Sequence, residues 1–285
     1  LFPYTTLFRS GGKEMEECRA SLKERYLVIG ASSDVALAWL ENLGERCRRE
    51  KKENVTVVAH YHSHDDALSS IAECYPEIRL LLVSADLTKE EGTQIILQFL
   101  FNEDVIPEAV LYFPAETFRY MRLKEFDRER LDGAVCVGAA GFLSLMKELL
   151  PKMKRLEDAR VLVMLTAYVK EELPPKFMVD YVTGKYALLG AMKAVAAEFG
   201  SDTLKINAVS PEMMDTKFLK ELDPRIKEMS ALNAPEKRLL TPEDLVCVID
   251  HMISSEYKEN GRNEGIFSPS EAREFFTGQR GRADE

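Results

Sequence analysis

Tyr181 and Lys185 are the residues of this chain whose types and spacing best suit chemistry. They lie four residues apart in an apolar run typical of a helix, and side chains at this spacing share one face of a helix, about one turn apart. A phenol with its ordinary pKa of about 10 exchanges protons poorly at neutral pH, but a cation beside it stabilises the phenolate and lowers that pKa. The pair therefore predicts proton exchange with an alcohol or a carbonyl. Because both residues are common on amphipathic helices, a purely structural pair is the alternative.

The elements around this helix favour the catalytic interpretation. A strand-like run at residues 160–165 precedes it and ends at Thr166, and a second run at residues 204–211 follows it with the motif Asn-Ala-Val-Ser-Pro. This order of strand with terminal hydroxyl, Tyr-x-x-x-Lys helix and Asn-Ala-Val-Ser-Pro strand resembles the short-chain dehydrogenase/reductase family. The resemblance implies that Thr166 orients a substrate carbonyl, although Tyr168 fits the family's usual distance to the catalytic tyrosine better.

The first strand of the region leads into a candidate phosphate cradle. Residues 26–43 indicate a short apolar strand, a tight turn and the start of a helix, where backbone N–H groups and the helix dipole favour an anion. The family pattern is Gly-x-x-x-Gly-x-Gly, of which this chain keeps only Gly30, while Asp34 and Ala36 take the other two places. Asp is conformationally acceptable there, but its charge is unfavourable beside phosphate. The resemblance implies cofactor contacts at Gly30, Ser32, Ser33, Asp34 and Val35, and a structural turn is the alternative.

The end of the second strand, at residues 55–60, indicates which nicotinamide cofactor is used. NAD-preferring folds usually place an acid here against the ribose hydroxyls. This chain instead has His60, followed by His62 and Ser63. Because these side chains can donate hydrogen bonds and no carboxylate would repel a 2′-phosphate, we predict NADP(H) rather than NAD(H). The histidines lack a nearby cysteine or acidic cluster, so a solvated loop is predicted and no metal site.

The resemblance implies further cofactor contacts at three other strand ends. One run ends in an Asp-Leu pair that matches the family's adenine contact. Another runs into Pro-Ala where the family has Asn-Asn-Ala-Gly, and the last is followed by a threonine that meets the nicotinamide carboxamide or the phosphates. These residues are Asp86, Leu87, Pro114, Ala115, Pro211 and Thr216, and Tyr181 and Lys185 complete the set, Lys185 through the nicotinamide ribose. Asp86 alternatively caps the helix that follows it.

One departure from the family bears directly on catalysis. Aligning residues 135–142 with the family's Val-Asn-x-x-Gly-x-Phe places Val137 where the family has its catalytic asparagine, which holds a water in a proton relay. The change predicts slower or rerouted proton delivery, or loss of catalysis. The rival hypothesis is therefore a catalytically impaired relative that acts as a nucleotide-sensing or scaffolding protein.

Length and composition favour one large α/β domain. The chain has 285 residues, 46% of them hydrophobic, and strand-like runs alternate with helical stretches. This alternation predicts a Rossmann-like doubly wound parallel sheet in a single domain at residues 25–269. A net charge of −10 argues against nucleic acid and anionic lipid as partners. No uninterrupted apolar run approaches the roughly 18 residues of a membrane span, and five cysteines without a Cys-x-x-Cys motif indicate reduced thiols and a cytoplasmic location.

The two ends of the chain are expected to lie outside the domain. Residues 1–24 are predicted to form a flexible leader, and residues 1–10 match one reading frame of a common sequencing-adapter oligonucleotide, so they are expected to be artefactual. Residues 270–285 lack a strand signal and are predicted to be a flexible tail.

The resemblance also implies substrates and partners. A small carbonyl compound or an acyl thioester is the expected substrate, with 3-oxoacyl chains on an acyl carrier protein as the leading example. Basic residues between Arg119 and Arg130 could dock such an acidic carrier, but interleaved acids favour a solvated mixed-charge helix. A homodimer or homotetramer is expected because the helix at residues 178–199 packs against a partner subunit in the family. Burial within one chain would explain its apolar stripe equally well.

Overall fold

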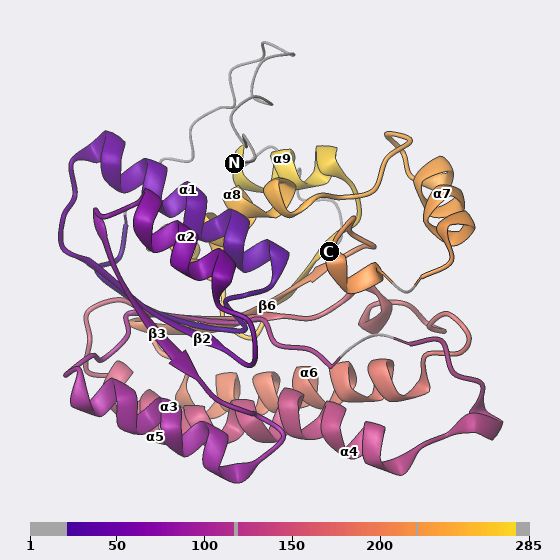
Figure 1. Ribbon diagram of the computed structural model, residues 1–285, viewed down its shortest axis with the longest axis horizontal. Coiled ribbons are helices and arrows are strands. Elements are labelled where there is room, and N and C mark those ends of the chain that lie inside the picture. The colour runs from indigo at the N-terminus through magenta and orange to yellow at the C-terminus, as the bar shows by residue number, and fades with distance from the viewer. Residues whose placement is uncertain (1–21, 117–118, 221, 278–285) are drawn as a thin grey trace.

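Seven parallel strands form the central layer of the residues that the computed structural model describes, which are 22–116, 119–220 and 222–277 (Figure 1). Their order in the sheet is β3-β2-β1-β4-β5-β6-β7. Most of these segments are nearly continuous apolar runs, because a parallel sheet covered on both faces buries both sides of each strand. The strands are β1 Arg25–Ile29, β2 Val55–Tyr61, β3 Ile78–Ser84, β4 Ala109–Tyr112, β5 Ala159–Met164, β6 Leu204–Pro211 and β7 Asn263–Ile266.

Helices cover both faces of this sheet, which confirms the predicted Rossmann-like doubly wound fold (Figure 1). One face carries α1 Asp34–Glu50, α2 Asp66–Cys74, α8 Pro242–Ile253 and α9 Pro269–Thr277. The other carries α3 Glu90–Asn102, α4 Arg128–Val135, α5 Gly141–Met153 and α6 Val179–Phe199. The remaining elements are α7 Pro224–Asn233, the 3₁₀ turns η1 Leu123–Glu125, η3 Ala167–Val169 and η4 Lys217–Leu219, and the π-helical turn η2 Cys136–Ala140.

The strand order reverses between β1 and β4, and this reversal fixes the position of the site. Ile29 of β1 pairs with Tyr112 of β4, Tyr112 pairs with Val163 of β5, and Val163 pairs with Ala208 of β6. The carboxyl ends of these four strands therefore meet at one edge of the sheet. In open α/β sheets, ligands bind in the crevice at such a switch point.

A buried polar cluster joins α1 to α8. The Asp250 carboxylate accepts a hydrogen bond from Trp39 Nε1 at 2.8 Å and another from Arg46 Nη1 at 2.7 Å. All three side chains are almost fully buried. Asp250 therefore accepts from two donors of α1, an indole N–H and one guanidinium nitrogen, that have little access to water.

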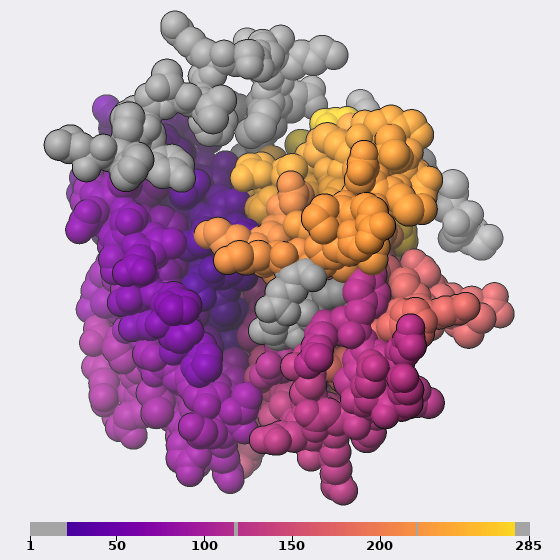
Figure 2. Space-filling view, turned by 45° about the vertical axis from the view of Figure 1, so that its right-hand side comes forward, coloured from indigo at the N-terminus to yellow at the C-terminus, as the bar shows by residue number. Residues whose placement is uncertain are grey.

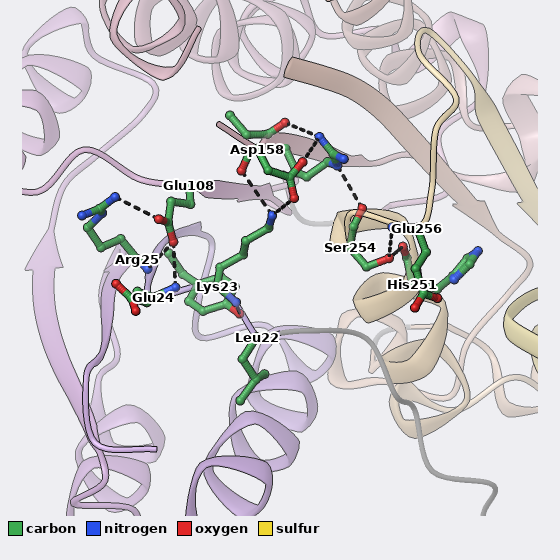
Figure 3. Close-up of polar contacts among 12 residues, drawn as sticks. Leu22, Lys23, Glu24, Arg25, Glu108, Asp158, His251, Ser254 and Glu256 are labelled. Atoms are coloured by element: carbon green, nitrogen blue, oxygen red, sulfur yellow. Dashed lines mark hydrogen bonds and ion pairs between the residues drawn. The ribbon is translucent and has the colours of Figure 1, made fainter. Parts of the chain in front are cut away.

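Ion pairs connect elements at the opposite, amino-terminal edge of the sheet. Lys23 contacts the Asp158 carboxylate, and the Glu108 carboxylate accepts a hydrogen bond from Arg25 Nη2 at 2.9 Å (Figure 3). The buried Arg160 side chain pairs with Asp158 and donates to the Ser254 carbonyl at 3.0 Å. Lys23, two residues before the predicted boundary at residue 25, is therefore held to the domain by its contact with Asp158.

The C-terminal boundary also differs from the sequence prediction. Residues 270–277 belong to α9 rather than to a flexible tail, and Ala272 in this helix is only 1% exposed. Phe275 packs edge-on against His251 of α8, with ring centroids 5.6 Å apart. The absence of a strand signal was uninformative here because the segment is an amphipathic helix. Residues 1–21 and 278–285, including most of the predicted leader, lie outside the described residues.

The helical run Arg128–Met153 is long and apolar enough to cross a membrane by length and composition alone. Half of its most apolar window is buried inside the protein. Phe142, Leu145 and Met146 of this run pack in the core beneath the sheet. Since the core helix of a globular protein meets the same criteria, we interpret the run as such a helix.

Candidate active site

The structure brings Thr166, Tyr181 and Lys185 together at the carboxyl edge of the sheet. Thr166 follows β5, and its side chain is hydrogen-bonded to the Tyr181 side chain. Lys185, one turn further along α6, donates from Nζ to the Met164 carbonyl at 2.9 Å, and its Nζ lies 6.0 Å from the centroid of the Tyr181 ring. Tyr168, the alternative partner of the tyrosine, lines the same pocket as Thr166 and Tyr181.

Burial controls the protonation of the Tyr181 and Lys185 pair. Desolvation raises the pKa of Tyr181 to about 12, against a smaller lowering by the Thr166 hydrogen bond. Desolvation also lowers the pKa of Lys185 to about 8. We expected Lys185 to depress the pKa of the phenol, but in the free protein burial dominates and the phenol stays protonated at neutral pH. This state suits a proton donor.

Asp180 positions the first turn of α6, a role that the sequence did not reveal. Its Oδ1 accepts a hydrogen bond from the Tyr181 backbone N–H at 2.8 Å, and its Oδ2 accepts one from Arg130 Nε of α4 at 3.2 Å. The Asp180 side chain is 5% exposed. The acid directly before Tyr181 could have suggested such a role from the sequence. Its pairing with Arg130, 50 residues away, could not have been predicted.

Two pockets meet at Tyr181. The first encloses about 460 Å³, part of it open to solvent, between α4 and α6, and the second encloses about 520 Å³, also partly open, under the segment that follows β6. In Figure 2, the orange segment after β6 lies against the indigo-to-purple N-terminal part of the chain. The first is lined by Pro114, Ala115, Tyr181 and Lys185, among others, and the second by Thr166, Tyr168, Tyr181, Pro211, Glu212 and Thr216 together with apolar side chains.

The turn between β1 and α1 has the backbone expected of a cradle. Gly30 has a φ of +77°, and a Cβ there would lie 2.9 Å from the Pro114 nitrogen, so both the backbone angle and the close approach require glycine. Ser33 caps α1, accepting a hydrogen bond from the Ala36 N–H at 3.4 Å, and Ser32 is exposed. Val35 is a core residue, which leaves only its backbone for a ligand.

Asp34 departs from the expected phosphate contact, because its carboxylate is engaged within the protein. Oδ2 accepts the Lys217 backbone N–H at 2.6 Å, and Oδ1 lies 3.6 Å from Lys217 Nζ. The partner belongs to the segment after β6, 183 residues away in sequence. The turn is therefore closed by a contact that local sequence patterns do not encode.

The imidazole of His60, predicted to be a donor to the cofactor, is engaged within the protein. His60 is 2% exposed, and both ring nitrogens are engaged: the Gly30 N–H donates to Nδ1 at 3.2 Å, and Nε2 lies 3.0 Å from the Ala85 carbonyl. Burial lowers the pKa of this imidazole. The strand continues to Tyr61, so alternation along it directs His60 inward. His62 and Ser63 are exposed and remain candidates.

Asp86 forms a turn with Thr88 before α3, but it does not cap the helix as the alternative predicted, because α3 begins at Glu90 with Lys89 as its N-cap. Its Oδ1 accepts from the Thr88 N–H at 3.0 Å and from the Thr88 hydroxyl at 2.6 Å, and these hydrogen bonds lower the pKa of Asp86 to about 2. The adjacent Leu87 is a buried core residue. An adenine contact here would therefore involve the Asp86 backbone or its remaining carboxylate surface.

Val137 leaves no polar group for the relay water of the family. Its side chain is buried, and its carbonyl accepts a hydrogen bond from Tyr112 Oη at 2.6 Å within the π-helical turn η2. Burial also raises the pKa of Tyr112, which keeps the phenol a donor. This contact could not be predicted, because Tyr112 has the pattern of an ordinary strand residue.

The described residues contain no group of three or more His, Cys, Asp or Glu side chains placed to hold a metal ion. Cys47, Cys74 and Cys136 have free thiols. The hydroxyls of Thr166 and Tyr181 and the ammonium of Lys185 at the carboxyl edge suit proton transfer.

Comparisons with known proteins agree with this geometry. The family model for enoyl-(acyl carrier protein) reductase matches residues 44–258. The uncharacterized oxidoreductase YmfI of Bacillus subtilis is 22% identical over 80% of this chain and 90% of its own length. The 3-oxoacyl-[acyl-carrier-protein] reductase FabG of Aggregatibacter actinomycetemcomitans is 27% identical over 81% of this chain and 92% of its own.

Solved structures share the fold at lower identity. An L-sorbose reductase from Gluconobacter frateurii, complexed with NADPH and L-sorbose, superposes with a TM-score of 0.72 at 19% identity, covering 85% of this chain and 94% of that one. A levodione reductase superposes with a TM-score of 0.76 at 17% identity, covering 87% and 98%. The strand order, the Tyr181 and Lys185 pair and the family match over most of the chain lead to one conclusion: the protein belongs to the short-chain dehydrogenase/reductase family of oxidoreductases.

Proposed function

We propose that the protein is an NADP(H)-dependent oxidoreductase that interconverts a carbonyl compound and its alcohol. The observation that carries the proposal is the Thr166, Tyr181 and Lys185 cluster, which lies where two pockets meet. Bound NADPH would supply the hydride. Thr166 orients the carbonyl oxygen by a hydrogen bond, and the protonated phenol of Tyr181 gives its proton to that oxygen.

Most residues at the crevice fit such a cofactor. The Gly30 turn and the start of α1 offer backbone amides to phosphate, and the exposed His62 and Ser63 offer donors to a 2′-phosphate. Pro114 and Ala115 line the first pocket beside Lys185, and Pro211 and Thr216 line the second. The L-sorbose reductase is described as an NADPH complex, which supports the same choice here. Asp34 is the exception to this fit.

Lys185 gives the reaction a pH dependence. Because its pKa is about 8 in the free protein, the ammonium is protonated below that pH and lost above it. An ammonium is needed to hold the ribose hydroxyls and to favour proton release from Tyr181. We expect kcat/KM for NADPH to be level below about pH 7 and to fall about tenfold per pH unit above about pH 8. Initial rates at saturating carbonyl and varied NADPH measure this pH dependence. A kcat/KM that stays constant up to about pH 10 would contradict the role of Lys185.

The second pocket favours a carbonyl on a largely apolar body. Met178, Met213 and Phe218 line it beside Thr166 and Tyr181. A 3-oxoacyl thioester has this character, and the relative named 3-oxoacyl-[acyl-carrier-protein] reductase supports it as the leading substrate. Docking of an acyl carrier protein is the weaker part of the proposal, because the candidate basic residues Arg128 and Arg130 pair with Asp132 and Asp180.

Comparing the two nicotinamide cofactors on a panel of carbonyl compounds tests this proposal. NADPH and NADH are titrated against the protein by reduced-nicotinamide fluorescence, and an acetoacetyl thioester, a diketone and a ketose are then added while absorbance is followed. We expect tighter binding of NADPH than of NADH and fastest turnover of the thioester. Tighter binding of NADH, or turnover only of the ketose, would refute the cofactor or the substrate assignment respectively.

A nucleotide-sensing or scaffolding protein is the second candidate. One observation favours it: the Val137 carbonyl already accepts a hydrogen bond from Tyr112, and the Val137 side chain is apolar. The family's proton relay would therefore find no available polar group at this position. The same titration separates the two functions. NADPH binding without turnover of any carbonyl would support the sensor.

Assembly and location complete the proposal. The apolar stripe on α6 that suggested a subunit interface is buried in the chain's own core, with Leu188, Met192 and Val195 almost inaccessible. Burial within one chain therefore explains the apolar stripe, as the alternative predicted. The proposal of a homodimer or homotetramer now rests on family membership alone. The free thiols of Cys47, Cys74 and Cys136 are consistent with the proposed cytoplasmic location.

A further inference from the structure

The contact between Asp34 and Lys217 joins the turn after β1 to the segment after β6. The proposed dinucleotide would lie between these two segments. Asp34 is the first residue of α1, directly after the Gly30 turn, and Lys217 is the first residue of η4, after β6. The carboxylate accepts the Lys217 N–H at 2.6 Å and lies 3.6 Å from its ammonium. The Asp34 side chain is 19% exposed and the Lys217 side chain 82%.

The Asp34 carboxylate is not the N-cap of α1. Ser33 already caps this helix through its hydroxyl, which accepts from the Ala36 N–H. The Asp34 side chain points away from α1 and contacts Lys217 on the other side of the crevice. Its side chain therefore serves the contact with Lys217, which holds residues 216–220 against the turn.

The position of this carboxylate is the one where the proposed function needs the cofactor phosphates. The α1 N-terminus favours an anion on one side, and the Lys217 N–H and ammonium favour one on the other. Thr216, which precedes Lys217, lines the second pocket next to the reacting groups. In the free protein, the anion that the Lys217 N–H and ammonium contact is the chain's own Asp34 carboxylate.

We propose that Asp34 is an internal competitor of the cofactor phosphates, and that dinucleotide binding breaks its contact with Lys217 and releases residues 217–220. The inference rests on the proposed function, because the phosphates are those of its cofactor. The competition has two consequences. Cofactor affinity is lower than the rest of the site would allow, and the segment over the substrate pocket is held closed until the cofactor arrives.

Asp34→Asn tests this competition, because it keeps the shape of the side chain and removes the charge. Asp215→Asn is the matched control: Asp215 lies in the same segment, is 69% exposed and pairs with Lys227 rather than with the turn. We expect Asp34→Asn to bind NADPH about tenfold more tightly than the wild type, since a negative charge no longer opposes the phosphates. Asp215→Asn should bind NADPH as the wild type does.

Hydrogen exchange in the free protein gives a second, cofactor-independent measurement. Amides of residues 217–220 should exchange faster in Asp34→Asn than in the wild type and in Asp215→Asn. Asp34→Ser serves as a second variant if the asparagine form does not fold. If the wild type binds NADPH and both Asp34 variants bind it equally tightly or more weakly, the inference is overturned. The proposed function would stand in that case. If neither the wild type nor the variants bind NADPH, the proposed function fails and the competition fails with it, whatever the exchange rates are.

Discussion

Replacing Tyr181 by Phe is expected to reduce carbonyl reduction about 10³-fold while leaving NADPH affinity within about twofold. The phenol is the proton donor at the point where the two pockets meet, and burial keeps it protonated at neutral pH. Phenylalanine preserves the ring, so its tilted packing on Phe218, with centroids 5.9 Å apart, persists. The loss should therefore fall on kcat rather than on the affinity for the cofactor.

Tyr186 provides the matched control for this substitution. It lies on the same helix, but its side chain is 41% exposed and does not line either pocket. Tyr186→Phe should retain wild-type rates of NADPH oxidation, measured by absorbance at saturating carbonyl. Equal activity in Tyr181→Phe and Tyr186→Phe would remove Tyr181 from the reaction.

Replacing Asp250 by Ala is expected to lower the free energy of unfolding by about 3–5 kcal/mol. The substitution leaves the buried Arg46 guanidinium and the Trp39 indole N–H without the carboxylate that accepts from both. A buried charge that loses its partner destabilises a fold far more than an exposed one does. The helices α1 and α8, which this cluster joins, should loosen together.

Urea unfolding followed by tryptophan fluorescence measures this change, since Trp39 is the single tryptophan and lies within the cluster. Asp132→Ala is the control, because Asp132 and its partner Arg128 are both largely exposed, and it should change stability by less than about 1 kcal/mol. A similar midpoint for the Asp250 and Asp132 variants would show that the buried cluster does not hold α1 to α8.

Much of the fold could be predicted because most strands are apolar runs separated by helical stretches. The strands β1, β2, β5 and β6 were apparent from such runs, and their parallel order followed from the alternation with helices. The motif residue Asn207 proved structural, since it donates to the Glu259 carbonyl at 2.8 Å and accepts the Arg262 N–H at 2.9 Å. The helix α9 was missed because a short amphipathic segment after the last strand gives no pattern of period two.

The candidate site was predictable where it depends on local spacing and strand ends. Tyr181, Lys185 and Thr166 meet because a helix places residues four apart on one face and parallel strands end at one edge. Three contacts were not predictable. His60 turns inward because its strand runs one residue longer, and the pairs Tyr112 with Val137 and Asp34 with Lys217 link positions far apart in sequence.

Direct hydride transfer is the measurement that tests the central claim. The protein is incubated with NADPH that carries deuterium at the hydride-donating carbon and with an acetoacetyl thioester, and the product is analysed by mass spectrometry. We predict one deuterium on the new carbinol carbon with the wild type and at most a trace of labelled alcohol with Tyr181→Phe over the same time. NADPH bound by the wild type without labelled alcohol from any carbonyl of the panel would contradict the proposed reaction.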